Sequence, residues 1–168
     1  MTGGVDDLSI PELVRLGVER GYSDRIPGLK LTGIDRAAVN ASRAWFRVPE
    51  RRYAWDWFRI LKRSGTGRFD LAMWSGALLC GLAYGPEAAD YAAIHYLEGC
   101  PHRDHPLRGY VLPVAVAAVE LQAALLRKPE IRLLEPDPGL RARYEEFGYE
   151  AVFSGGRLIY MTKRRIEP

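Results

Sequence analysis

The fold of this chain is decided by residues 91–126, which read YAAIHYLEGCPHRDHPLRGYVLPVAVAAVELQAALL. The stretch begins as a short apolar strand, continues through a polar loop rich in turn residues, and ends as a long apolar helix that opens just after a glycine. Backbone N–H groups at the start of such a helix can bind an anion, most often a phosphate. The sequence therefore predicts a strand, an anion-binding loop and a buried helix in the middle of the chain.

Composition and charge restrict the class of protein. The 168 residues are enough for one domain with a full core, and 48% hydrophobic and 27% charged residues are ordinary for a globular protein. The net charge of +3 is too balanced to indicate nucleic-acid binding by itself. The apolar run that begins at Val111 is interrupted by Pro113 and Glu120 and is too short to cross a bilayer, so we expect no membrane contact.

The N-terminal sequence and the cysteine content both indicate where in the cell the protein works. The N-terminal residues lack the basic start and the long apolar core of a signal peptide. Cys80 and Cys100 form no CxxC pair and no disulfide framework. We therefore expect a cytoplasmic protein.

The remaining elements follow from capping residues, periodicity and turn residues. Ser9 and Glu12 have the spacing of a capping box at the start of a first helix. Helices are then expected at 35–48, 50–64, 111–127 and 137–148, and strands at 29–34, 69–74, 77–85, 91–97, 131–135, 151–154 and 158–164. Two-residue turns are expected at Ser75-Gly76 and Gly155-Gly156.

This order predicts an α/β protein with a mixed central sheet and helices on both faces. A strand–helix–strand unit lies between antiparallel hairpins, so strands 91–97 and 131–135 should be parallel neighbours that part at their carboxyl ends. We expect one domain over residues 29–168, with residues 1–28 as an N-terminal helical appendage.

The order of elements resembles the GNAT superfamily of N-acyltransferases over about residues 29–164. LLCGLAYG with AIHYLEG resembles the paired third and fourth strands of that family, and HPLRGYVLPVAVAAVELQAALL resembles its pyrophosphate loop and helix. IRLLEPDPGLRARYEEFGYEAV resembles its next strand and the helix that carries a tyrosine. The resemblance implies a coenzyme-A-dependent N-acyltransferase, with acetyl-CoA as co-substrate and an unidentified small-molecule or protein amine as acceptor.

The resemblance also implies roles for particular residues. Tyr144 matches the tyrosine that protonates the leaving thiolate, and Glu98, at the end of the central strand, is the expected base. The coenzyme is expected on Leu97 of the same strand and on the loop and helix start, at Arg103, Arg108, Gly109, Tyr110 and Val111. The family loop pattern [QR]-x-x-G-x-[GA] keeps only its central glycine here, with Pro106 and Val111 at the outer positions.

Two other interpretations remain open at this level. The altered loop is compatible with a GNAT-fold binding or regulatory module without catalysis. The arginines and aromatic residues of 43–59 could contact RNA, although their helical spacing favours packing on the sheet, a border of the acceptor site, or a homodimer contact. Cys100, His102 and His105 have no second cluster to complete a metal shell, so we predict no metal site.

Overall fold

The computed structural model describes residues 7–53, 55–63 and 67–166. Its order of elements confirms the one predicted from the sequence. The helices are α1 (Ile10–Tyr22), α2 (Arg36–Ser42), α3 (Trp57–Lys62), α4 (Val111–Leu125) and α5 (Arg141–Glu146), with 3₁₀ turns η2 (Arg43–Arg47) and η3 (Pro138–Leu140). The strands are β1 (Leu29–Thr32), β2 (Arg68–Ser75), β3 (Leu78–Pro86), β4 (Tyr91–Ile94), β5 (Tyr96–Gly99), β6 (Glu130–Leu134), β7 (Glu150–Ser154) and β8 (Arg157–Arg164).

Side-chain caps begin the helices where the sequence predicts them. The Ser9 side chain accepts from the backbone of Glu12, whose carboxylate binds the Ser9 backbone, so the predicted capping box is confirmed. Asp35 caps α2, and the Asp137 side chain accepts from Gly139 at the start of η3. Each cap satisfies a backbone donor that the first turn of a helix leaves without an internal partner.

The first sheet is antiparallel throughout, in the order β1-β2-β3-β5. Its hairpin pairs Ser75 with Leu78, so the two turn residues are Gly76 and Ala77, one position later than predicted. Gly76 has φ 58, and its left-handed conformation is the reason the turn settles there.

The second sheet has the order β4-β6-β8-β7 and contains the parallel pair that the sequence predicts. Tyr91–Ile94 of β4 runs parallel to Glu130–Leu133 of β6, while β6–β8 and β8–β7 are antiparallel. The closing hairpin turns at Gly155 and Gly156, as expected.

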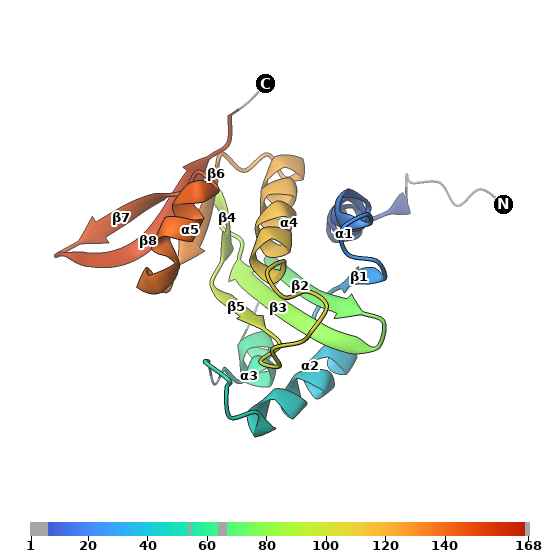
Figure 1. The fold of residues 1–168 in the computed structure, drawn as a ribbon. Coiled ribbons are helices and arrows are strands. Elements are labelled where there is room, and N and C mark those ends of the chain that lie inside the picture. The colour runs from blue at the N-terminus through green and yellow to red at the C-terminus, as the bar shows by residue number, and fades with distance from the viewer. Residues whose placement is uncertain (1–6, 54, 64–66, 167–168) are drawn as a thin grey trace.

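The central strand is not continuous, which corrects the prediction of one strand over 91–97. β4 pairs with β6, but after Ile94 the chain changes partner and β5 pairs with β3. The amide of His95 donates to the carbonyl of Tyr84 at the change. The two four-stranded sheets therefore meet at this strand and diverge beyond it (Figure 1).

Helices cover both faces, as the fold class predicted (Figure 1). α1 and α4 lie on one side, where the larger core cluster contains Val14, Phe69, Leu71, Val119 and Leu133. α2 and α3 lie on the other side, over a cluster that includes Trp45 and Trp57. α1, within the predicted N-terminal appendage, contributes the buried Val14 and Val18 to the core it shares with α4.

The predicted helix over 50–64 is wrong for most of its described length. Only Trp57–Lys62 is helical, since Asp56 adopts an extended backbone and caps α3 by accepting from Arg59. Residues 50–53 and 55–56 instead run irregularly across the end of β5, where Arg51 and Trp57 bind Glu98. Tertiary contacts to a distant strand have overridden the helical pattern of this segment. Positions 54 and 64 of the predicted helix lie outside the described residues.

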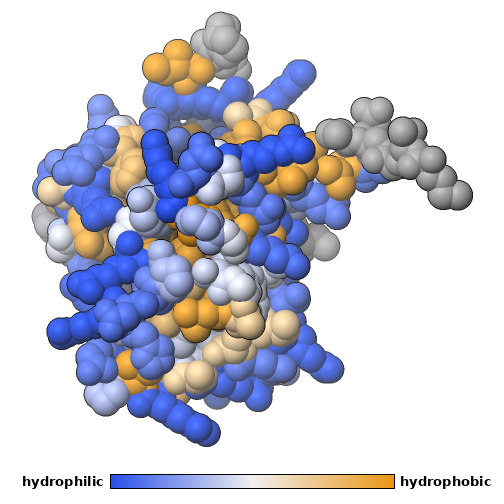
Figure 2. All heavy atoms as spheres, turned by 45° about the vertical axis from the view of Figure 1, so that its right-hand side comes forward, coloured by the Kyte–Doolittle hydropathy of each residue, from blue (hydrophilic) through white to orange (hydrophobic). Residues whose placement is uncertain are grey.

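The surface is mostly polar where Figure 2 shows it. Hydrophilic side chains form most of the outline of this face, and apolar side chains gather in smaller areas between them. No helix in the described part of the chain is long and apolar enough to cross a membrane.

Candidate functional site

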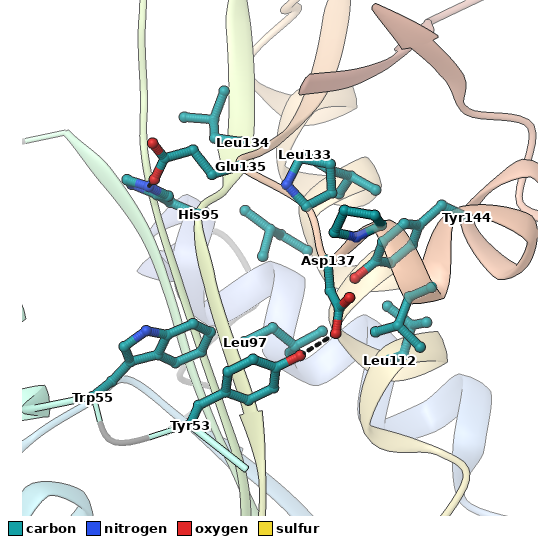
Figure 3. A pocket seen from close by; sticks show the side chains of 14 residues that line it. Tyr53, Trp55, His95, Leu97, Leu112, Leu133, Leu134, Glu135, Asp137 and Tyr144 are labelled. Atoms are coloured by element: carbon teal, nitrogen blue, oxygen red, sulfur yellow. Dashed lines mark hydrogen bonds and ion pairs between the residues drawn. The ribbon is translucent and has the colours of Figure 1, made fainter. Parts of the chain in front are cut away.

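A pocket of about 390 Å³ opens where the two sheets diverge. It lies between the divided central strand, the carboxyl end of β6, the first turn of α4 and the helix α5 (Figure 3). Its apolar wall consists of Ile94, Leu97, Leu112, Leu133, Leu134 and Leu140. Carboxyl ends of parallel strands are a common position for ligand sites, because the strands separate there and leave a crevice.

Three polar side chains converge at one side of this pocket. Tyr53 donates a hydrogen bond to Asp137, and Figure 3 shows the hydroxyl of Tyr144 directed toward the same carboxylate. Arg52 lies 3.1 Å from Asp137 on the outer side. The pKa of Asp137 is lowered, first by the Tyr53 hydrogen bond and then by the Gly139 amide. Asp137 is therefore an ionised group that can accept a proton or a hydrogen bond in the pocket.

Tyr144 is nearly buried, at 7% exposure, with its ring against the core cluster. Burial, followed by the nearby Tyr53 and Asp137, raises the pKa of its phenol to about 12. Its hydroxyl consequently stays protonated at neutral pH and is available as a donor. This position agrees with the predicted role of Tyr144 as an acid, a role that stays a prediction.

His95 and Glu135 form a second polar pair at the opposite side of the pocket (Figure 3). Nε2 of His95 lies 2.9 Å from Oε2 of Glu135. The hydrogen bond to His95, and then the charge of His95, lower the pKa of the Glu135 carboxyl. Glu135 has φ 44, a left-handed conformation that directs the chain out of β6 toward the pocket rim. An imidazole held by a carboxylate is a suitable base for an amine.

The free edge of β5 faces the pocket. β5 is the last strand of its sheet, and Cys100 immediately after it donates to Cys80 of β3. Because strand N–H groups alternate in direction, the amides of Leu97 and Gly99 point away from β3 toward the second sheet. The side chain of Leu97 lines the pocket. This predicted residue therefore brings both an apolar contact and an edge amide to the site.

The start of α4 is open to a ligand. Tyr110 is its N-cap residue but contributes no side-chain hydrogen bond, so the amides of the first turn lack a cap from that residue. Gly109 has φ 83, and a Cβ built there meets nothing within 4 Å. Backbone amides and the helix dipole at this end favour an anion.

Val111 occupies space that two glycines leave free. A Cβ on Gly81 would lie 2.9 Å from one methyl of Val111, and a Cβ on Gly99 would lie 3.5 Å from the other. The bulk of Val111 is therefore directed down onto β3 and β5 instead of outward to the loop. The departure from the family's small residue at this position is accommodated inside the protein.

The loop arginines lie at the surface. Arg103 and Arg108 are exposed, and Nη1 of Arg108 donates to the Arg103 carbonyl at 3.1 Å. Arg143 of α5, which the sequence did not single out, donates to the Gly109 carbonyl at 3.4 Å. The guanidinium groups of Arg108 and Arg143 thus bind backbone carbonyls of the loop before α4, and the exposed Arg103 belongs to the same loop. Arginine contacts to phosphate are common.

Glu98 is not brought to the pocket. It is 3% exposed, and it lies on the other face of β5 from Leu97, among the aromatic residues of the second core cluster. Arg51 holds it through Nε at 2.7 Å and Nη2 at 2.9 Å, and the indole of Trp57 donates to it at 2.9 Å. The geometry thus separates Glu98 from Tyr144, whereas His95 and Asp137 share the pocket with Tyr144.

The remaining motifs do not gather at a site. Among the described residues no group of three His, Cys, Asp or Glu side chains could hold a metal ion. Burial raises the thiol pKa of both Cys80 and Cys100, which makes the thiolate less available. Trp45 and Trp57 are each 2% exposed and cannot stack on bases, whereas Phe46 and Phe58 of the same segment are exposed.

The sequence does not single out the residues that share the pocket with Tyr144. Asp137 stands at the start of the expected 137–148 helix, Glu135 at the end of the expected 131–135 strand, and Tyr53 among the aromatic residues of 43–59. The available signal was that Glu135 and Asp137 directly follow a strand predicted to be parallel to its neighbour, at the edge where such sheets bind ligands.

Comparison with known proteins agrees with the fold. No protein-family model matches the chain, and no curated protein matches it in sequence. Among solved structures it is similar to the ribosomal-protein-S18-alanine N-acetyltransferase of Escherichia coli, with a TM-score of 0.58 at 13% identity over 81% of this chain and 93% of the other. The PaiA N-acetyltransferase of Thermoplasma acidophilum, in complex with coenzyme A, gives 0.58 at 12% identity over 82% and 99%.

A variant of spermidine N-acetyltransferase from Vibrio cholerae gives a TM-score of 0.56 at 16% identity, over 82% of this chain and 94% of the other. These matches confirm the fold class: the chain has the fold of the GNAT N-acetyltransferases. At identities this low, the agreement between the structures shows the architecture alone.

Proposed function

We propose that this chain is a coenzyme-A-dependent N-acyltransferase, with acetyl as the expected acyl group and direct attack of an amine on the thioester. The observation that carries the proposal is the arrangement around the divided central strand. The uncapped start of α4, the free edge of β5 and the hydroxyl of Tyr144 surround one apolar pocket. An extended thioester with phosphates at one end needs these three features together.

The chain's own groups supply binding for each part of such a substrate. The first-turn amides of α4 with Arg103, Arg108 and Arg143 suit the phosphates. The leucines of the pocket suit an apolar, extended arm. The amide of Leu97 suits the thioester oxygen, where negative charge develops during attack.

Proton transfer can be assigned to two side chains. We assign to His95, held by Glu135, the removal of a proton from the acceptor ammonium. The amine nitrogen then bonds to the acyl carbon while the carbon–sulfur bond breaks. Tyr144 gives its proton to the departing sulfur and regains one from the nitrogen through solvent or Asp137. In this assignment Glu98, the base expected from the sequence, instead holds Arg51 and Trp57 in place.

The alternative is a GNAT-fold module without catalysis. Pro106 and Val111 at the outer positions of the loop pattern favour it, since Pro106 has no side-chain donor for a phosphate. Packing of Val111 against Gly81 and Gly99 weakens this argument, because the side chain does not crowd the outer side of the helix start.

The test is binding followed by turnover. We expect coenzyme A to raise Tm, because a ligand that binds only the folded state stabilises it. Thiol release from acetyl-CoA should then increase when suitable amines are added. No Tm shift at millimolar coenzyme A would contradict the proposal and favour the non-catalytic module. A Tm shift without amine-dependent thiol release from any amine would leave a coenzyme-A-binding module.

A further inference from the structure

A second pocket of about 420 Å³ adjoins the first. The two share Trp55 and His95, so these side chains form a common wall. Its other side is made by α3 and by the end of β3, with Asp56, Arg59, Arg63 and Tyr84. The proposed base therefore borders both spaces.

The charge of this pocket comes from α3. Arg59 and Arg63 are four residues apart and lie on the same face of the helix. Asp56 is the acidic side chain beside them, and both of its carboxylate oxygens already interact with Arg59. Oδ1 accepts a hydrogen bond from the Arg59 amide, and Oδ2 lies 3.4 Å from Nε of the Arg59 guanidinium. The side chain of Arg59 is 75% exposed and can reach a ligand. The balance among these three charges is positive.

Besides Ile60 and Pro86, the rest of the pocket is lined by aromatic rings that ring contacts hold in place. Tyr96 meets Trp55 edge to face, with centroids 5.3 Å apart, and Tyr84 lies 6.2 Å from Tyr96. Trp55 is in turn stacked on Tyr53 at 4.7 Å. Rigid rings of this kind favour a flat apolar group at low cost in conformational entropy.

We infer that the acceptor is a primary amine attached to a flat apolar group that carries a carboxylate or a phosphate at its far end. This inference rests on the proposed function. The acidic end pairs with Arg59 and Arg63, the flat part lies against Trp55 and Tyr96, and the amine lies beside His95. A linear polyamine is disfavoured, because its additional positive charges would face the two arginines.

The experiment compares three acceptors built on the same aminomethyl-benzene frame: 4-(aminomethyl)benzoate, 4-(aminomethyl)phenyl phosphate and 4-(aminomethyl)benzamide, which is neutral at the far end. Thiol release from acetyl-CoA gives kcat/KM for each, and spermidine is the polycationic comparison. We expect at least one acidic acceptor to exceed the neutral one by about tenfold, the combined effect of two exposed ion pairs. The acidic acceptor with the higher kcat/KM shows whether the natural acceptor carries a carboxylate or a phosphate.

Charge-reversal variants locate the preference. Arg59→Glu with Arg63→Glu should abolish or invert it, while Arg36→Glu, an exposed arginine of α2 outside this pocket, should leave it unchanged. All variants should keep the Tm shift with coenzyme A. If coenzyme A binds and amines are turned over, yet the neutral acceptor or spermidine is preferred, this inference is overturned and the proposed function stands. If coenzyme A does not bind, both are overturned.

Discussion

The guanidinium of Arg51 binds both carboxylate oxygens of Glu98 inside the protein, 47 residues apart in the chain. Their side chains are 6% and 3% exposed. Arg51 also donates to the Trp55 carbonyl at 2.9 Å, and its Cζ lies 4.2 Å from the centroid of the Phe46 ring. The pair joins the irregular segments 50–53 and 55–56 to β5, and so it fixes the wall that the two pockets share.

Breaking the Arg51–Glu98 pair should affect the stability of the folded state more than it affects kcat. We expect Glu98→Gln and Arg51→Met each to lower the free energy of unfolding by about 3–5 kcal/mol, because each leaves a buried partner without compensation. Nη1 of Arg51 is buried and already lacks a hydrogen-bond partner, so the loss of Glu98 would leave still more of the guanidinium unsatisfied. Urea unfolding measures the loss. If Glu98→Gln kept its stability and lost kcat, Glu98 would be the base after all.

Removing one hydroxyl tests the acid. Tyr144→Phe should keep the ring packing and lower kcat about 10²–10⁴-fold, the usual contribution of a positioned general acid. The Tm shift with coenzyme A should persist. Tyr160→Phe, a tyrosine of β8 that does not line the pocket, is the matched control. Equal losses in both variants would mean that Tyr144 is structural.

The raised pKa of Tyr144 makes a separate prediction about alkaline pH. Since its folded pKa is about 12 and its ordinary value is 10.0, the folded state holds the proton more tightly. The stability linked to this group should be complete below pH 10 and disappear as pH rises toward 12. Tyr144→Phe should lack this component of the stability curve. A wild-type kcat that falls with an apparent pKa of 10 would contradict the assignment of Tyr144 as the acid.

Substitutions in the His95–Glu135 pair should show that His95 is the base and that Glu135 only positions it. His95→Gln should lower kcat about 10²-fold or more, because the base is lost. Glu135→Gln should have a smaller effect, since the imidazole remains. The measurement is kcat for both variants, with the Tm shift caused by coenzyme A as a check that binding is kept. An unchanged kcat in His95→Gln would place the base elsewhere.

A charge at the start of α4 should prevent coenzyme A binding. Gly109→Glu puts a carboxylate beside the proposed phosphate position, whereas Gly109→Ala adds the same backbone strain at φ 83 without charge. We expect Gly109→Glu to abolish the Tm shift with coenzyme A and Gly109→Ala to reduce it only partly. Equal shifts in both variants would show that phosphates bind elsewhere.

The close approach of β4 to β3 depends on Gly85. A Cβ at this position would lie 1.7 Å from the carbonyl oxygen of Ala93, which no side-chain movement can relieve. Gly85→Ala should therefore destabilise the protein by about 3–5 kcal/mol. Gly99→Ala, whose Cβ would meet its nearest atom at 3.5 Å, should cost far less. Thermal unfolding of the two variants tests the contrast.

The sequence by itself determined the order of elements and the pairing of the 91–94 and 130–133 segments. These features depend on local signals: Ser9, Asp35 and Asp137 cap helices through groups a few residues away, and the glycines at 76 and 155–156 adopt turn conformations that other residues resist. The resemblance of the central stretch then leads to the GNAT fold, which the solved structures confirm.

Only the tertiary structure decided where the central strand divides and which polar groups meet there. Long-range contacts overrode the helical pattern of the 50–64 sequence. Arg51 and Trp57 donate hydrogen bonds to the buried Glu98, and no local pattern in the sequence reveals these contacts. His95 with Glu135, and Tyr53 with Asp137, are 40 and 84 residues apart. Capping and periodicity act over a few residues, whereas burial and charge pairing depend on which distant segments the sheets bring together.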